Sequence, residues 1–262
     1  MRRYLRLYAH FIRFSFSKAM EFRVDFFFRV GMDVFWYAIH LAFFTVLFAH
    51  IGLLGGWTFD QVLVFAAAMF FVDAVQMTVF SNNMWWLPFL VNRGDVDYYL
   101  VRPVNTLFFL SLREFAANSF LNLLLAMGIL VWAVARYPDP VSAGRVALFV
   151  GLLLAGAVLH YVMTMIFIIP VFWLQSRTGL REVGWNVSRF GSRPHTIFTG
   201  WMRRIIMSVL PFAFVPSVPC AAHLESPIAA FLLHTAAVVA CAFAVMLALW
   251  HAALKSYTSA SS

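Results

Sequence analysis

Residues 92–105 read NRGDVDYYLVRPVN, a short charged segment between two long apolar stretches. Gly94 and Pro103 favour turns within it. Both charge signs gather there, on Arg93, Asp95, Asp97 and Arg102. A simple connector between two membrane helices needs no such chemistry, whereas a docking surface for a soluble partner does. We therefore interpret this segment, the 92–105 loop, as a docking surface.

The composition on either side of this loop is that of a membrane protein. Of 262 residues, 63% are hydrophobic and only 11% are charged. A soluble domain carries about a quarter charged residues, so this chain cannot cover itself with polar surface. The 30 Phe and 9 Trp suit a lipid-facing exterior with aromatic belts at the interfaces. We predict an all-α integral membrane protein.

The apolar stretches indicate how often the chain crosses the membrane. A spanning helix needs about 20 apolar residues, and six stretches qualify. The expected spans lie at approximately residues 30–51, 59–82, 106–135, 146–175, 203–222 and 228–254. Together they form one membrane domain over residues 30–262.

Residues 1–29 have a different pattern. Cationic side chains alternate there with Tyr, Leu and Phe, at Arg2, Arg3, Arg6, Arg13, Lys18, Arg23 and Arg29. Such a segment lies in the headgroup layer with its basic side toward anionic lipids. We predict an interfacial amphipathic helix that leads into the first span.

The remaining Lys and Arg residues predict the orientation. They concentrate around the 92–105 loop, within residues 177–204 and at Lys255, whereas the other side holds only Arg136 and Arg145. Cytoplasmic loops carry the excess of Lys and Arg, so we expect both termini in the cytoplasm. The formal charge of +8 follows from this topology, and we do not expect nucleic-acid binding.

No sequence pattern for catalysis or metal binding is present. A phosphate-binding loop needs GxxxxGK[ST], and Lys18 and Lys255 both lack that context. His40, His160 and His234 are scattered, and a metal site needs a cluster. We expect no catalytic residue, no metal and no bound nucleotide in this chain, so any ATP coupling must come from a partner.

Two carboxylates near the expected membrane core have two interpretations each. Ion coupling uses carboxylates deep in the bilayer, and Asp73 and Glu114 are the candidates, with Asp33 at the cytoplasmic end of the first span. Alternatively, Glu114 pairs with Arg113 at the interface, and Asp73 faces a subunit contact or a cavity. The sequence leaves both alternatives open.

The expected fifth span is interrupted. Pro194 and Gly200 precede it, and Pro211, Pro216 and Pro219 break its far end. Broken helices at membrane depth either line a cavity or pack inside protein. We therefore name as pathway candidates Asp73, Trp201, Pro211, Phe212 and Phe214.

Three blocks of the sequence resemble the ABC-2 type permeases of bacterial ABC exporters, in particular the uncharacterised and viologen-exporter-like subgroup. The blocks are Gly94-Asp95-Val96-Asp97…Leu100…Arg102-Pro103-Val104-Asn105, Pro194…Ile197-Phe198…Trp201…Arg204 and Pro211-Phe212-Ala213-Phe214-Val215…Pro219. The resemblance covers essentially the whole chain, and its first block is the most specific. Ser217-Val218 departs from the aromatic pair expected there.

The resemblance implies a type V exporter-like architecture of six spans with an N-terminal interfacial helix, in the bacterial inner membrane. Two permeases, identical or homologous, form the pathway, and a dimer of ATPase subunits binds ATP and Mg. The 92–105 loop becomes the coupling surface. The residues implied in coupling are Arg93, Asp95, Asp97 and Arg102 as ion-pair partners, Gly94 and Pro103 as turn formers, and Glu21 and Arg23 as a connecting element.

The composition of the expected pathway indicates only a broad class of substrate. An aromatic-rich pathway with few charges favours amphiphilic, lipid-like or drug-like cargo, although ABC-2 permeases also export polysaccharides. Two other functions are weighed against an exporter subunit: an ion-coupled transporter or channel that uses Asp73 or Glu114, and a structural membrane subunit that transports nothing.

Overall fold

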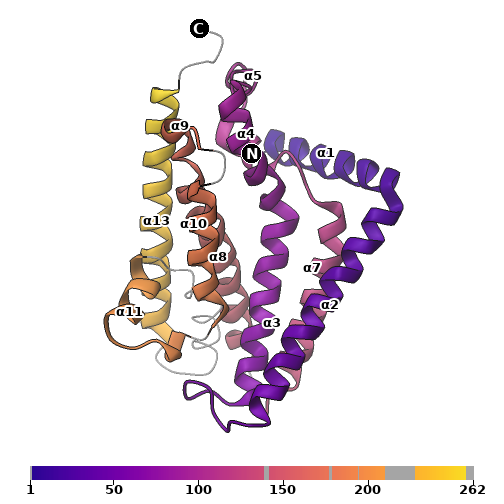
Figure 1. Ribbon diagram of the computed structural model, residues 1–262, viewed down its shortest axis with the longest axis vertical. Helices are drawn as coiled ribbons and strands as arrows, with labels where there is room; N and C mark the ends of the chain where they lie inside the picture. Colours follow the sequence, from indigo (N-terminus) through magenta and orange to yellow (C-terminus); the bar gives the residue numbers. More distant parts are fainter. Residues whose placement is uncertain (1, 139–141, 177–178, 194, 210–227, 258–262) are drawn as a thin grey trace.

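The structure is a computed structural model that describes residues 2–138, 142–176, 179–193, 195–209 and 228–257. Within these ranges the chain is helical throughout, apart from turns and one isolated bridge between Leu54 and Trp57. The long helices run side by side, and the start of α1 and the last turn of α13 lie toward the same end (Figure 1). The prediction of an all-α protein is confirmed.

The elements follow one another in this order: α1 Arg2–Ala19, η1 Met20–Phe22, α2 Arg23–Phe48, α3 Phe59–Gln76, η2 Met77–Ser81, α4 Asn82–Arg93, α5 Asp97–Leu100, α6 Thr106–Leu112, α7 Ala117–Ala135, α8 Ala143–Ile168, α9 Val171–Leu174, α10 Gly179–Ser188, η3 Arg189–Ser192, η4 His195–Ile197, α11 Gly200–Arg204, η5 Ile205–Val209 and α13 Ile228–Ser256. We call the end of the bundle with α1, α5 and the last turn of α13 the α1 end, and the end with residues 49–58 the opposite end.

Five helical stretches among the described residues are long and apolar enough to cross a membrane. They are Phe26–Phe48, Phe59–Arg93, Ala117–Ala135, Ala143–Leu174 and Leu232–Ser256. They overlap the first four and the last of the expected spans. The expected span over 203–222 lies mostly outside the described residues, so the count of six stays a prediction.

The bundle is built around α3. Its side chains from Val62 to Phe70 are almost completely buried, and it packs against α2, α7 and α8. By contrast, α2 exposes large apolar side chains such as Phe27, Phe28 and Phe43. Since apolar side chains are stable against lipid, α2 is suited to the periphery of a membrane domain.

The N-terminal helix α1 lies across the α1 end of the bundle, steeply inclined to the long helices (Figure 1). Its aromatic residues contact α6 and α7. The Tyr4 and Phe108 ring centroids are 4.8 Å apart, those of Phe11 and Phe109 are 5.2 Å apart, and those of Phe16 and Phe120 of α7 are 5.8 Å apart. The turn η1 joins α1 to α2. The first long helix thus begins at Arg23, earlier than the expected span at residue 30.

The stretch expected as one span over 106–135 is divided in two. Helix α6 ends at Leu112 and α7 begins at Ala117, with Arg113 and Glu114 in the irregular segment between them. Backbone groups in such a break need hydrogen-bond partners where water is scarce. The buried side chain of Asn83 in α4 supplies two of them: its Nδ2 donates to the Glu114 carbonyl oxygen at 2.8 Å, and its Oδ1 accepts from the Glu114 N–H at 3.0 Å.

Neighbouring elements accept hydrogen bonds from two further backbone N–H groups of this break. The Ala116 N–H donates to the Thr78 carbonyl oxygen at 2.8 Å, and the Phe115 N–H donates to Ser15 Oγ of α1 at 3.1 Å. Thr78 lies in η2, a π-helical turn whose widened ring leaves a backbone carbonyl available. The break is therefore fixed to η2, α4 and α1 together.

The cluster of Arg residues in 177–204 led us to expect this segment at the α1 end. The structure differs, because the segment after α8 leaves that end. Helix α10 packs along α8, because Gly184 allows close approach: a Cβ added there would lie 2.9 Å from Phe167. Farther along, a Cβ added at Gly55 would lie 2.8 Å from Thr196 Oγ1. Residues 195–197 thus reach the opposite end of the bundle. The contacts of an apolar helix face outweigh the tendency of single Arg residues to stay on one side.

We predict that Asn83→Leu destabilises the fold, because the N–H and C=O of Glu114 lose their partner in α4. Two lost hydrogen bonds cost about 1–3 kcal/mol in total. Thermal denaturation in detergent, followed by size-exclusion chromatography, measures the effect. Asn92→Leu is the matched control, since Asn92 bonds only within α4, to the Pro88 carbonyl oxygen. Equal losses in the two variants would contradict the role of Asn83.

The position of residues 195–197 gives a second prediction. With Cys220 and Cys241 replaced by Ser, Ile197→Cys should react with a membrane-impermeant maleimide from the same side as Leu53→Cys. Asp95→Cys should react from the other side. Labelling of Ile197→Cys from the side of Asp95→Cys would show that this segment returns to the α1 end.

Candidate functional site

The 92–105 loop begins with a tight turn at the end of α4. Gly94 adopts φ 77°, in the left-handed region that favours glycine. The Asp95 N–H donates to the Leu90 carbonyl oxygen at 3.0 Å, and the Gly94 N–H donates to that of Val91 at 3.2 Å. These bonds form a helix-terminating motif. They stop α4 and set the direction of the short helix α5.

Apolar and aromatic contacts hold the loop against the helix bundle. Val96 is completely buried. The ring of Tyr99 lies 5.4 Å from that of Phe109 in α6, and its hydroxyl accepts a hydrogen bond from Arg113. The loop ends where Asn105 Oδ1 accepts from the Phe108 N–H at 2.9 Å and so caps α6.

The loop also contacts α1. The Asn105 N–H donates to the Tyr4 hydroxyl at 3.3 Å, and the Tyr4 ring packs on Phe108. Movement of the loop would therefore act directly on α1.

The charged residues of the loop fall into two groups. Arg93 and Asp95 are exposed, as is Pro103, and no ion pair holds either charge within the described ranges. Arg102 is partly buried: its guanidinium lies 4.1 Å from the Tyr98 ring centroid and 5.1 Å from that of Phe109. We expected all four charges to face a soluble partner, and Arg102 instead turns back onto the aromatic residues beneath it.

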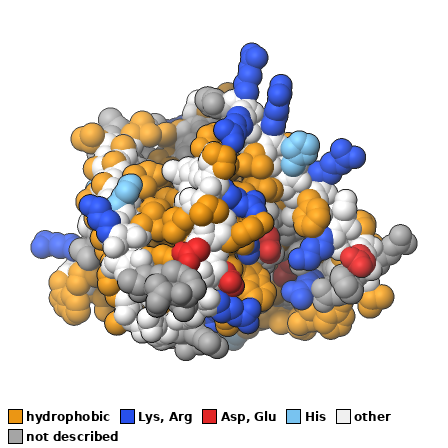
Figure 2. Space-filling view, turned by 90° about the horizontal axis from the view of Figure 1, so that it is seen from above, with side chains coloured by type: hydrophobic (Ala, Val, Ile, Leu, Met, Phe, Trp, Pro, Cys, Tyr) orange, Lys and Arg blue, Asp and Glu red, His pale blue; other side chains and the backbone are white. Residues whose placement is uncertain are grey.

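Asp97 belongs to the contact between the loop and the C-terminal end of the chain. Burial raises the pKa of Tyr257, and the nearby carboxylates of Asp97 and Asp95 raise it further. The Tyr257 ring also packs on Phe172 of α9, at 5.7 Å. The loop, α9 and the end of α13 thus form one surface. Figure 2 views this end of the molecule and shows Lys and Arg side chains spread over it, with a few carboxylates among them.

The two residues expected as a connecting element lie near the turn between α1 and α2. Glu21 is in η1 with an exposed side chain, and Arg23 is the first residue of α2. The side chain of Arg23 lies outside the described part of the structure.

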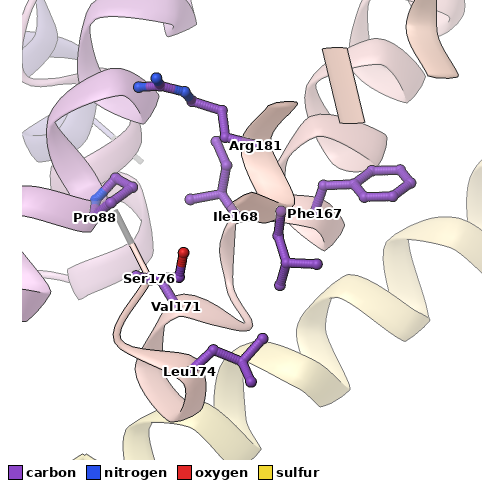
Figure 3. A pocket seen from close by; sticks show the side chains of 8 residues that line it. Pro88, Phe167, Ile168, Val171, Leu174, Ser176 and Arg181 are labelled. Carbon is purple, nitrogen blue, oxygen red and sulfur yellow. The ribbon is translucent and has the colours of Figure 1, made fainter. Parts of the chain in front are cut away.

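Sequence reasoning missed Arg181. Its guanidinium lies 4.0 Å from the Trp85 ring centroid of α4, and it lines a small pocket with Pro88, Ile168 and Val171 (Figure 3). Arg181 also pairs with Glu182 at 3.4 Å. The available signal was Pro170, which follows the end of α8; the chain then reverses, so that α10 packs along α8 and Arg181 reaches Trp85.

The two membrane carboxylates have different surroundings. Glu114 pairs with Arg113 at 3.6 Å, which is the interfacial pairing that the sequence left open. Asp73 Oδ1 of α3 lies 3.9 Å from His160 Nδ1 of α8. Tyr37 of α2 and Asn122 of α7 complete a polar group at this point, and the buried Asn122 Oδ1 has no hydrogen-bond partner among the described residues.

Of the remaining pathway candidates, only Trp201 lies in the described part of the structure, and it is not brought to Asp73. Trp201 lies on α11 with 69% of its surface exposed, and no hydrogen bond, ion pair or ring contact joins it to Asp73 in the described ranges. Pro211, Phe212 and Phe214 lie outside the described residues.

Comparison with known families identifies this architecture. A family model described as "ABC-2 family transporter protein" matches residues 34–261, which is most of the chain. A search of curated proteins and a search of solved structures give no match. The match agrees with the bundle of long apolar helices and makes the chain a transmembrane transport subunit. The protein therefore belongs to the ABC-2 family of ABC transporter membrane subunits.

Proposed function

We propose that this chain is a permease subunit of an ATP-driven exporter in the bacterial inner membrane. In this proposal it forms half of the translocation pathway with a second permease, identical or homologous. A separate ATPase dimer binds ATP and Mg and docks on the 92–105 loop from the cytoplasm, where both chain termini also lie.

One observation carries the proposal. Arg93 and Asp95 are exposed on a turn that is rigidly fixed to the bundle, at the end where Lys and Arg concentrate. Unpaired opposite charges on a rigid surface suit a protein partner, because charge complementarity selects the partner and its register. Glu21, also exposed, lies in the turn between α1 and α2, and we propose that it takes part in coupling, as we expected for Arg23 from the sequence.

The contacts beneath the loop suggest how ATPase closure reaches the membrane. Tyr99 and Arg113 link the loop to the break at Glu114, and Asn83 links that break to α4. Between α3 and α4 lies the π-helical turn η2, and such turns are frequent at functional sites. A push on the loop would tilt α4 and α1 together, with η2 as the hinge.

The roles of Arg102 and Pro103 follow from their positions. Arg102 holds the loop on the aromatic residues of α5 and α6, and the fixed φ of Pro103 sets the turn into α6. We place Asp73 and the residues around the fifth expected span, Trp201, Pro211, Phe212 and Phe214, along the pathway. The low charge of these surroundings favours amphiphilic, drug-like or lipid-like cargo.

The coupling role predicts a specific effect of charge reversal. Asp95→Arg with Asp97→Arg should reduce the amount of ATPase that co-purifies with the tagged chain by about tenfold or more, because attraction becomes repulsion. Asp60→Arg is the matched control, since Asp60 lies in the first turn of α3 at the opposite end. Quantitative mass spectrometry of the purified complex, with an ATPase assay, gives the readout. Wild-type chain that purifies without any ATPase in mild detergent would defeat the proposal.

The polar group around Asp73 favours a second candidate, an ion-coupled transporter. Its supporting observation is the approach of Asp73 to His160 at 3.9 Å, since paired ionisable residues within a membrane commonly serve proton or cation movement.

Asp73→Asn separates the two candidates. If an ATPase drives transport, this variant keeps its full complement of ATPase, and wild-type vesicles transport with ATP after the proton gradient is collapsed. Transport that stops with the proton gradient and ignores ATP would favour the ion-coupled candidate.

A further inference from the structure

A large cleft opens at the α1 end, beside the coupling surface. Its volume is about 810 Å³, and its walls come from α1, the start of α2, α5, α6 and the start of α7. Asn82 and Asn118 lie at its inner side, on helices that cross the membrane. The cleft therefore extends from the polar end of the bundle to the level of the membrane helices.

The cleft has an excess of positive charge. Four cations line it, Lys18, Arg29, Arg102 and Arg113, against the single carboxylate of Glu114, which already pairs with Arg113. In the part of the chain that the structure describes, no carboxylate pairs with Lys18 and no acceptor bonds to Arg102. Arg102 is partly buried against aromatic rings. The Arg102 guanidinium lines the cleft, and an anionic group there could accept hydrogen bonds from its N–H donors.

The rest of the wall is aromatic. Phe11 and Phe14 of α1, Phe26 of α2 and Phe115 line the cleft, and Phe14 has 71% of its surface exposed. Cations and aromatic rings on the wall of one cleft match a molecule with an anionic head and an apolar tail. The amphipathic helix α1 lies along this boundary, where anionic lipid headgroups are found.

We propose that this cleft binds an anionic phospholipid, with its phosphate at Lys18 and Arg102 and its acyl chains against the aromatic wall of α1 and α2. The lipid would bind whether or not an ATPase docks on the 92–105 loop. Free phosphate would leave the aromatic wall uncovered. A protein partner would find Arg102 turned inward instead of presented to it.

Native mass spectrometry of the full chain in detergent tests this proposal. The probes are phosphatidylglycerol, phosphatidylcholine with the same acyl chains, and inorganic phosphate. We expect phosphatidylglycerol adducts to persist where phosphatidylcholine adducts are lost. In Lys18→Gln with Arg102→Gln, affinity for phosphatidylglycerol should fall about fivefold for each cation removed.

Controls separate this effect from misfolding. Arg136→Gln removes an Arg that also lies over an aromatic ring, at 5.8 Å from Trp132, but at the opposite end, and it should bind phosphatidylglycerol like wild type. Lys18→Gln alone changes an exposed residue of α1 and should give the single fivefold loss in a folded chain. Equal retention of both lipids by wild type, or full affinity in Lys18→Gln, would overturn the proposal. Displacement of the lipid by millimolar phosphate would indicate a site for free anions and would overturn it as well.

Discussion

The arrangement of the α1 end depends on which groups form hydrogen bonds with the backbone where one helix is interrupted inside a membrane protein. Between α6 and α7 the backbone leaves the helical path, and the side chain of Asn83 bonds both the N–H and the C=O of Glu114. Lipid supplies no hydrogen bonds, so this break is stable only where protein groups replace the lost helical bonds. A single amide can do so because it carries a donor and an acceptor side by side.

Several features follow from this bond. Because the chain is interrupted at Glu114, α6 is short and the 92–105 loop lies directly over it, where Tyr99 and Arg102 pack on Phe109. The same break lets α1 reach the Phe115 N–H through Ser15. The 92–105 loop and the cationic cleft are therefore held by the same hydrogen bonds. A protein partner on the loop and a lipid in the cleft would both act on the same joint between α4 and α7.

The membrane class, the helical fold and most of the spans could be predicted from the sequence, because about 20 apolar residues without charge have few other stable conformations. The turn at Gly94 was equally predictable. The break in the helix at Glu114 could not be predicted. Arg113 and Glu114 show only that the stretch is polar there, and the hydrogen-bond partner Asn83 is distant in sequence. The direction of the Arg102 side chain depends on its contacts with aromatic rings. The direction of α10 depends on the close approach of Gly184 to Phe167. No local sequence pattern encodes either contact.

Photo-crosslinking in native membranes tests most directly whether the 92–105 loop is where an ATPase docks. A photoreactive residue would be placed at position 95, at the α1 end, and in a separate variant at position 53, at the opposite end. If the loop is the docking surface, position 95 crosslinks to a nucleotide-binding chain and position 53 does not. Crosslinking only to lipid at position 95, or to the nucleotide-binding chain from position 53, would contradict it.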